Sequence, residues 1–256
     1  MKKIVAMGFL GAALWSCFDS NESESPDQAT EPVERVDVEL YGQIREILME
    51  GRTEPRVELA DLSLSPTTYG LGALSELRGE ITIIDGQTWL AYSEPDGSVR
   101  IEQTTKPQDR AALLAMGRVC GWREMPINAE VAQPALGERV SALARESGFE
   151  GDGPLVFLVN GPVKGLHWHV VDGSRVPAGQ RGREAIVGNS VQGVLDEGQV
   201  ALVGFYAPDA QGIFVPPQSS VHVHVVSDEG MISGHVDEVV VLPGATLRLP
   251  VGQCAQ

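Results

Sequence analysis

SSVHVHVVSDEGMISGHVDEV, residues 219–239, is the most informative segment of this chain. Its first half alternates valine with a polar residue, and alternation with period two is typical of a β-strand with one buried face. We therefore expect strands at 221–226 and 232–242. The acidic and glycine residues at 228–230 favour a turn between them. The segment predicts a β-hairpin.

The histidines of this hairpin fall on one face. Residues two apart on a strand point the same way, so His222 and His224 should project together, about 6–7 Å apart. Positions 224 and 235 are equally far from the middle of the turn, so we expect His235 across the ladder from His224. Three imidazoles that converge in this way suit a divalent metal ion, zinc above all. Because three protein ligands leave a coordination position open, the pattern favours a catalytic site over a structural one.

Other interpretations of these histidines stay open. A buried histidine is usually a hydrogen-bonded core residue, and a pair on a strand can be a pH-sensitive surface feature. However, all five histidines of the chain lie in this hairpin and in LHWHVV, residues 166–171, and such clustering favours a metal site. Copper, nickel and iron are the alternatives to zinc for histidine ligands.

Elsewhere the sequence mixes strand and helix patterns. GEITIIDGQTWLAYS, residues 79–93, predicts a hairpin that turns at Asp85-Gly86. Further strands are expected at 155–159 and 166–171, with a Gly-Pro turn between them, and at 200–206 and 212–215. Amphipathic helices are expected at 38–50, ending at Gly51, and at 130–147. The order lacks regular β–α–β alternation, so we expect an α+β fold with mixed or antiparallel sheets and a few packing helices.

The N-terminus has the pattern of a bacterial lipoprotein signal. Lys2 and Lys3 precede an apolar run at 4–15 that is too short to cross a bilayer, and Leu14-Trp15-Ser16-Cys17 resembles a lipobox. We expect a signal peptide at 1–16 and a lipid on Cys17 that anchors the protein to a membrane outside the cytoplasm, in the periplasm or at the cell surface. The alternative is an ordinary cleaved signal in which Cys17 has no role.

The composition of the remaining sequence predicts a tether, a folded domain and the partners that the protein avoids. Residues 17–37 are acidic, contain serine and proline and lack apolar periodicity, so they predict a disordered tether ahead of a folded domain at 38–256. The formal charge of −16 repels phosphates and anionic headgroups, so we expect no nucleic-acid binding and no membrane contact beyond the lipid. In an oxidising compartment Cys120 and Cys254 either form a disulfide or remain two thiols.

Several of these segments together resemble the alpha-acetolactate decarboxylases. The HxH pair, followed eleven residues later by the histidine of GHV, is similar to the metal triad of that family. The resemblance also includes LYGQIREILMEG at 40–51, YGLGALSELRGEITIIDG at 69–86 and LVGFYAPDAQGI at 202–213. It extends from about residue 38 to about residue 242, and it implies the fold of that family and, by analogy alone, a homodimer.

The resemblance implies roles for particular residues. His222, His224 and His235 would be the metal ligands, and Glu80, which on its own would be an ordinary surface residue, would be the glutamate beside the metal. In the family the metal chelates the hydroxyl and keto oxygens of 2-hydroxy-2-methyl-3-oxobutanoate and stabilises the enediolate left by CO₂. The glutamate manages the proton that completes acetoin.

Three features differ from the family pattern. His169 stands where the family has an active-site arginine, and Ala73 stands where it has a threonine. The chain ends at LRLPVGQCAQ, residues 247–256, with no match to the family segment that carries a second glutamate. We interpret His169 as a catalytic acid–base group or a further metal ligand. The alternative is a structural histidine, with His167 on the same strand face.

The leading hypothesis is a metal-dependent decarboxylase acting on 2-acetolactate or a related 2-hydroxy-3-keto acid, with an acetoin-type product. A second is a zinc-dependent ester or lactone hydrolase, because a metal with an open position can lower the pKa of bound water to about 7. Glu80 or His169 would then be the base. A third is a non-catalytic lipoprotein that captures metal outside the cytoplasm.

Overall fold

A computed structural model describes residues 31–151, 153–252 and 254 of this chain. The expected signal peptide at 1–16, the lipidation site at Cys17 and the tether as far as residue 30 lie outside the described residues. Within the described ranges, no helix combines the length and the apolar character needed to cross a membrane.

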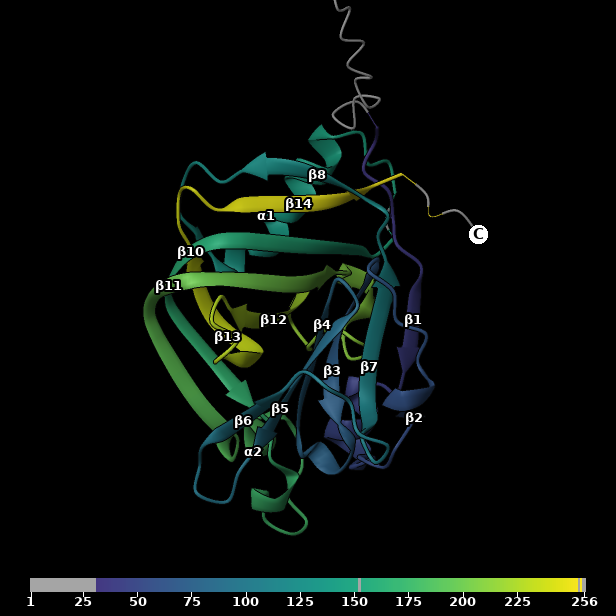
Figure 1. Ribbon diagram of the computed structural model, residues 1–256, viewed down its shortest axis with the longest axis vertical. Coiled ribbons are helices and arrows are strands. Elements are labelled where there is room, and N and C mark those ends of the chain that lie inside the picture. The colour runs from purple at the N-terminus through teal and green to yellow at the C-terminus, as the bar shows by residue number, and fades with distance from the viewer. Residues whose placement is uncertain (1–30, 152, 253, 255–256) are drawn as a thin grey trace, which may run out of the picture.

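Two seven-stranded sheets form the framework, the first at the lower right of Figure 1 and the second at the upper left. The first has the order β1-β7-β3-β4-β5-β6, with β2 paired to β7. Its strands are β1 (Val38–Tyr41), β2 (Val57–Glu58), β3 (Thr68–Leu74), β4 (Gly79–Ile84), β5 (Gln87–Ser93), β6 (Val99–Glu102) and β7 (Arg110–Arg118). The predicted hairpin at 79–93 is confirmed as β4 and β5, joined at Asp85-Gly86.

The second sheet has the order β8-β14-β10-β11-β12-β13-β9. Its strands are β8 (Gly121–Pro126), β9 (Val131–Ala132), β10 (Leu155–Val170), β11 (Val191–Tyr206), β12 (Val221–Ser227), β13 (Ser233–Val241) and β14 (Thr246–Val251). Because β13 pairs with β10 as well as with β12, the strands β10 to β13 close on themselves. The ladders between the described strands are antiparallel, and with the helices below they confirm the expected α+β class.

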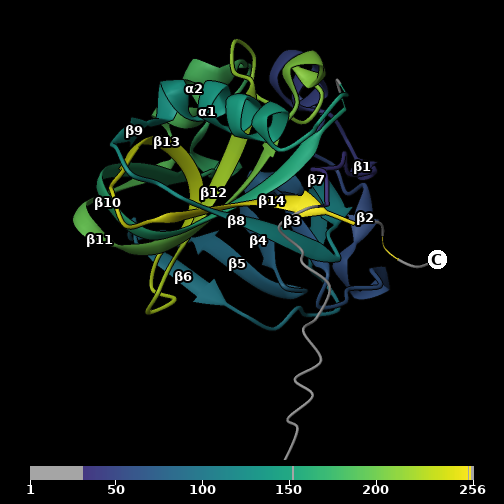
Figure 2. The same cartoon turned by 90° about the horizontal axis from the view of Figure 1, so that it is seen from above.

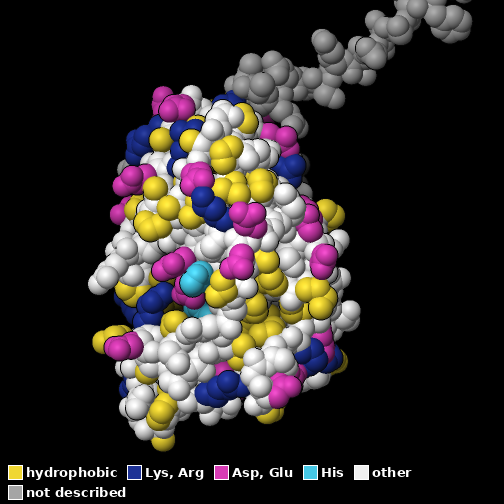
Figure 3. Space-filling view, turned by 90° about the vertical axis from the view of Figure 1, so that its left-hand side faces the viewer, with side chains coloured by type: hydrophobic (Ala, Val, Ile, Leu, Met, Phe, Trp, Pro, Cys, Tyr) yellow, Lys and Arg dark blue, Asp and Glu magenta, His cyan; other side chains and the backbone are white. Residues whose placement is uncertain are grey.

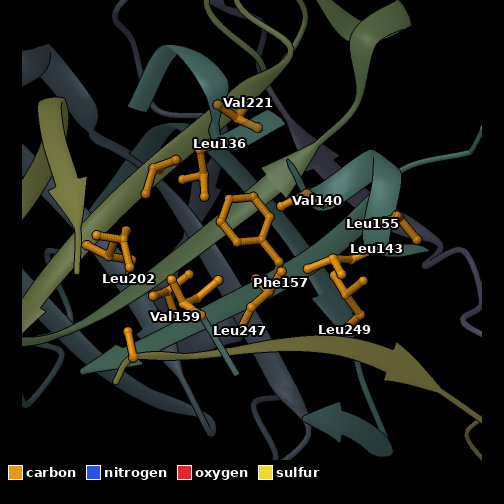
Figure 4. Packing of buried hydrophobic residues seen from close by; sticks show 14 of the residues in the cluster. Leu136, Val140, Leu143, Leu155, Phe157, Val159, Leu202, Val221, Leu247 and Leu249 are labelled. Atoms are coloured by element: carbon orange, nitrogen blue, oxygen red, sulfur yellow. The ribbon is translucent and has the colours of Figure 1, made fainter. Parts of the chain in front are cut away.

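The helices pack on the sheets or close their edges. They are α1 (Gln133–Glu146), α2 (Arg183–Gly188) and the short turns η1 (Glu46–Glu50), η2 (Leu59–Asp61), η3 (Ser75–Leu77), η4 (Gly173–Arg175) and η5 (Pro208–Ala210). Seen from above, α1 lies across the strands of the second sheet (Figure 2). Its apolar side chains Leu136, Val140 and Leu143 are buried against Phe157 and Leu247 (Figure 4). The helix predicted at 130–147 is therefore confirmed, with ends shifted by a few residues.

One predicted turn proves to be the middle of a strand. Residues 155–171 were expected to form two strands with a Gly-Pro turn between them, but β10 is continuous through Gly161 and Pro162. Before this point β10 pairs with β14, and after it with β13. The carbonyl oxygen of Pro162 accepts a hydrogen bond from Leu242 N at 3.0 Å, so this residue still takes part in the ladder although proline has no N–H to donate. The Gly-Pro step marks a change of partner within one strand.

The first predicted helix is shorter than expected. Val38–Tyr41 forms β1, paired with β7, and the helical turn begins only after Gly42. Gly42 has φ of +73° and lies so close to the carbonyl of Ala112 that a Cβ would be 2.1 Å from its oxygen. Only glycine fits this close approach, so the helix cannot extend back through it. The helical turn ends at Gly51, as predicted, in the left-handed conformation.

Two other strand boundaries differ from expectation. Residues 212–215 form a turn instead of a strand, because Gly212 has φ of +73° and its N–H bonds back to the carbonyl of Val215 at 2.8 Å. β11 begins at Val191 instead of residue 200. This early half of β11 is polar and exposed, and it is held by backbone pairing with β10, which side-chain periodicity does not reveal.

The end of the predicted tether packs on the domain. Val33 and Val36 are buried, and Val33 forms a bridge with Val251 of β14. Backbone N–H groups of the same segment bond to the carbonyls of Ser147 and Pro250. The apolar valines gain burial there, so the boundary expected at residue 38 is wrong for 31–37, which belong to the folded part.

Cys120 and Cys254 form a disulfide, with 134 residues between them in sequence. Cys120 lies between β7 of the first sheet and β8 of the second, and Cys254 follows β14. The bond therefore ties the C-terminal strand to the crossover between the sheets.

Replacing Cys254 by serine should lower the free energy of unfolding by about 2–5 kcal/mol, because the unfolded chain regains the freedom of a long loop. Thermal unfolding of the full chain, with and without reductant, measures this. Reductant should destabilise the wild type and leave Cys254→Ser unchanged. The double variant Cys120→Ser/Cys254→Ser is the control and should match the single one; equal stability of wild type and variant would contradict the prediction.

Candidate metal centre

Three histidines of one hairpin meet as the sequence predicted. His222 and His224 project from the same face of β12, and His235 of β13 is the register partner of His224. The nitrogen atoms that they offer lie within 4.8 Å of one another. His222 and His224 are buried and His235 is half-buried. The strand pairing has thus placed three imidazoles around one point.

The second ring nitrogen of His222 and of His224 has a partner that orients the ring. Nδ1 of His222 donates to the carbonyl oxygen of Phe214 at 2.7 Å, and since a carbonyl only accepts, the lone pair of this ring is on Nε2. Nδ1 of His224 lies 3.1 Å from Oγ1 of Thr82. The hydroxyl of Ser233 in turn donates to Thr82 Oγ1 at 3.2 Å. These contacts set which nitrogen each ring presents.

The inward nitrogens fit a metal ion. Nε2 of His224 is buried and has no hydrogen-bond partner among the described residues. Nε2 of His222 lies 3.0 Å from Nδ1 of His235. A buried polar atom without a partner is costly, and a divalent cation bound between these rings would remove that cost. The donor set, three imidazoles of which two have oriented rings, is typical of zinc sites.

The protonation state of the cluster also suits a metal. Burial lowers the pKa of His222 to about 4, and the hydrogen bond to Phe214 only partly opposes this. Burial, followed by the neighbouring histidines, lowers the pKa of His224 and of His235 well below the usual value. All three are therefore neutral at pH 7, which is the form of imidazole that binds metal ions.

Glu80 faces the histidines from the opposite sheet. It lies near the start of β4, is buried, and one of its oxygens is 3.7 Å from Nε2 of His224. Burial raises the pKa of this carboxyl well above its usual value, and a hydrogen bond from the backbone N–H of Val171 opposes the shift. Glu80 therefore holds its proton more strongly than a surface glutamate does. The structure brings together the four residues that the resemblance singled out.

His169 joins the cluster, and His167 does not. His169 of β10 is buried, is the register partner of His235, and its ring centroid lies 4.7 Å from that of His235. Its Nδ1 is 2.7 Å from a carboxylate oxygen of Asp237, which therefore orients the ring. His167 is exposed and outside the cluster.

A small pocket of about 100 Å³ lies beside the cluster. Most of its wall is apolar and comes from η1, α2 and the end of β3, and Ala73 is part of it. The polar lining residues are Glu80, His169, Arg183, His222 and His235. The face of the molecule in Figure 3 shows histidine at the surface, with acidic and basic side chains close by and a hydrophobic patch beside them.

Sequence reasoning missed several residues of this site. Asp237 had a usable signal, because it lies two residues after His235 and so shares its strand face. Thr82 had the same relation to Glu80. Arg183 had no local signal, since it lies in a short helix far from the other residues in sequence.

Comparisons with known proteins identify a family and a fold. The family model described as alpha-acetolactate decarboxylase matches residues 42–254. The crystal structure of acetolactate decarboxylase from Bacillus subtilis subspecies spizizenii has a TM-score of 0.67 and 18% identity, with 84% of this chain and 86% of that chain covered. A Staphylococcus aureus protein of unknown function, similar to alpha-acetolactate decarboxylase, has a TM-score of 0.65, 16% identity and the same coverages of 84% and 86%. At these identities the likeness establishes the fold. No curated protein sequence matches the chain significantly.

Replacing His224 by alanine should abolish stoichiometric zinc binding, because the remaining two histidines no longer enclose the ion. Elemental analysis of the purified, zinc-loaded protein measures the metal content. His167→Ala removes an exposed histidine outside the cluster and should keep the zinc content of the wild type. Full zinc occupancy in His224→Ala would place the metal elsewhere.

Replacing Thr82 by valine should weaken zinc binding by about 10- to 100-fold, because the ring of His224 loses the partner that orients it. Competition with a chelator of known affinity measures the change. Thr88→Val, the same substitution at a buried position of the neighbouring strand β5, is the matched control. Equal affinity in both variants would show that the hydroxyl of Thr82 has no part in the site.

Proposed function

This chain belongs to the alpha-acetolactate decarboxylase family, and we propose on this basis that it is a metal-dependent decarboxylase. Its substrate would be 2-acetolactate or a related 2-hydroxy-3-keto acid, and its products CO₂ and an acetoin-type hydroxyketone. The observation that carries the proposal is a buried glutamate 3.7 Å from a histidine of the candidate metal centre, beside a pocket of about 100 Å³.

His222, His224 and His235 would hold the metal ion, which when bound supplies Lewis-acid stabilisation of the negative charge that develops on the substrate oxygens. The protein residues prepare this site in advance. The carbonyl of Phe214 and the hydroxyl of Thr82 hold two of the rings, so these two rings need not reorient when a ligand arrives. All three imidazoles are neutral, so no proton has to leave them first.

Glu80 is the group placed to handle the proton of the reaction. Loss of CO₂ breaks a carbon–carbon bond and leaves an electron pair on the substrate, and a proton must then reach carbon to complete the hydroxyketone. Burial raises the pKa of Glu80 well above its usual value, so its carboxyl group retains a proton more readily than that of a surface glutamate and is suited to donate it. The hydrogen bond from Val171 N at 3.3 Å holds one carboxyl oxygen and leaves the other toward His224.

His169 would bind the substrate hydroxyl in the pocket and assist proton transfer. Asp237 accepts from Nδ1 of His169 at 2.7 Å, so Nδ1 carries the proton and the lone pair of Nε2 is left available. This nitrogen can accept the hydrogen of a substrate hydroxyl. His169 therefore complements Glu80 as a hydrogen-bonding and acid–base group in the same pocket.

The pocket limits the size of the substrate. Ordinary ligand pockets have volumes of about 300–1,000 Å³, several times the volume of this one. Its apolar side chains, such as Ile44, Ile47 and Ile186, suit short alkyl groups like the two methyl groups of 2-acetolactate. A compact, branched hydroxyketo acid fits this combination better than a long-chain ester.

The disulfide supports a location outside the cytoplasm. Such bonds persist in oxidising compartments and are rare in the cytosol, and Cys120 is bonded to Cys254 here. Together with the lipobox-like segment before Cys17, this supports the proposal of a lipid-anchored protein of the periplasm or cell surface.

Replacing Glu80 by glutamine should lower the rate of acetoin release from racemic 2-acetolactate by about 100- to 10,000-fold, because the amide cannot exchange the proton. Zinc content, measured on the same samples, should stay that of the wild type. Glu76→Gln, the same substitution at a nearby exposed position, should keep full activity.

Two outcomes would change the proposal. If Glu80→Gln kept the rate of the wild type, Glu80 would have no role in the reaction. If the zinc-loaded wild type released no acetoin but cleaved esters or lactones, the same residues would serve a hydrolase.

A further inference from the structure

Arg183 is the one lysine or arginine among the described residues that line the pocket. The other ionisable lining residues are three histidines and Glu80, and none of them carries the permanent positive charge of a guanidinium. Asp237, which bonds to His169 of the lining, is a carboxylate at the edge of the pocket and would repel an anion. Apart from a bound metal ion, Arg183 is therefore the lining residue whose positive charge does not depend on pH, and it can offset the charge of an anionic ligand here.

The guanidinium of Arg183 is free to change its partner. Its described polar contact is with an oxygen of Asp237, at the long distance of 3.3 Å, and its side chain is 53% exposed. Exposed ion pairs of this kind contribute little to stability, so turning away from Asp237 costs little. A guanidinium has five N–H donors in a planar fork, which leaves two parallel donors for a second carboxylate.

Two further observations place this charge close to the chemistry. Arg183 lines the same pocket as His169 and His235. Asp237 accepts from Arg183 through one oxygen and contacts His169 through the other. The arginine and the pocket histidine are thus held on opposite sides of one carboxylate, at the same edge of the pocket.

We propose that Arg183 binds the carboxylate of the substrate through a two-pronged hydrogen bond and so orients the carbon–carbon bond that is to break. This inference rests on the proposed function, because it assumes a substrate that carries one carboxylate. It assigns recognition of the substrate carboxylate to α2. The histidines of the candidate metal centre are on the β12–β13 hairpin, and the proton donor Glu80 is on β4. The pocket is then selective for an acid over its neutral analogue.

Calorimetry with two matched probes tests this without turnover. The probes are 2,3-dihydroxy-2-methylbutanoate and its neutral carboxamide, each titrated into the zinc-loaded full chain. The wild type should bind the carboxylate more tightly, and Arg183→Gln should weaken this binding by about 10- to 100-fold, because charge-assisted paired hydrogen bonds are lost. Binding of the carboxamide should stay within a few-fold of the wild type, which shows that the site is intact.

Two variants sharpen the comparison. Arg181→Gln removes an exposed arginine two residues earlier, which bonds to the carbonyl of Met49, and should leave both affinities unchanged. Arg183→Lys keeps the charge without the planar fork, and should recover only part of the preference. In the acetoin assay, Arg183→Gln should raise KM by about the same factor as the loss of affinity and should also lower kcat, because the bond that breaks is no longer oriented.

The outcomes separate the two proposals. If Arg183→Gln keeps the preference for the carboxylate, or weakens both probes equally, the assignment of Arg183 is overturned whether or not the wild type makes acetoin. A wild type that shows no preference overturns it as well. A wild type that releases no acetoin, but whose preference depends on Arg183, supports the carboxylate site and overturns only the proposed reaction.

Discussion

The pairing of β13 with both β12 and β10 is the constraint on which the rest of the site depends. His235 is the register partner of His224 on one side and of His169 on the other. Because side chains alternate along a strand, a slip of one residue in either ladder would turn His235 to the opposite face. The closed arrangement of β10 to β13 has no free edge at these positions, so neither register can slip independently.

The two sheets contribute different chemistry to one point. The second sheet provides the histidines, and β4 of the first sheet provides the carboxyl group of Glu80 and the hydroxyl of Thr82. They are held together by an apolar cluster between the sheets, which includes Tyr69 and Leu71 from one side and Phe205 from the other. The site by itself is destabilising, because the carboxyl group of Glu80 is buried there and Nε2 of His224 is buried without a hydrogen-bond partner. The apolar packing between the sheets offsets this cost. Such sites persist where the surrounding structure supplies the stability.

The polar groups and the apolar walls of the pocket come from different kinds of element. Its reactive groups are on strands, whose positions are set by long ladders, whereas its walls come largely from η1 and α2. Changes in these short elements can alter the size and charge of the pocket without moving the three histidines of the candidate metal centre. Arg183 illustrates this, since it brings a positive charge to the pocket from α2 and contacts the strands through Asp237 alone among its described polar partners.

Much of this protein was predictable from short stretches of sequence. The β12–β13 hairpin, its turn and the alignment of His224 with His235 follow from period-two alternation and from distances along the chain to a turn. The hairpin at 79–93 and helix α1 follow from equally local patterns. In these cases the interacting residues are near neighbours in sequence, so spacing alone specifies their geometry.

What only the tertiary structure decided depends on residues that are distant in sequence. Glu80 has an ordinary local context, and only the family resemblance singled it out in the sequence; packing of the sheets is what brings β4 to β12. Thr82 and His224, which touch, are 142 residues apart. The continuity of β10 through its Gly-Pro step depends on a change of partner strand, and the grouping of His169, Asp237 and Arg183 depends on the fold of three separate elements. Local periodicity carries no information about such contacts, because they are set by which apolar faces pack together.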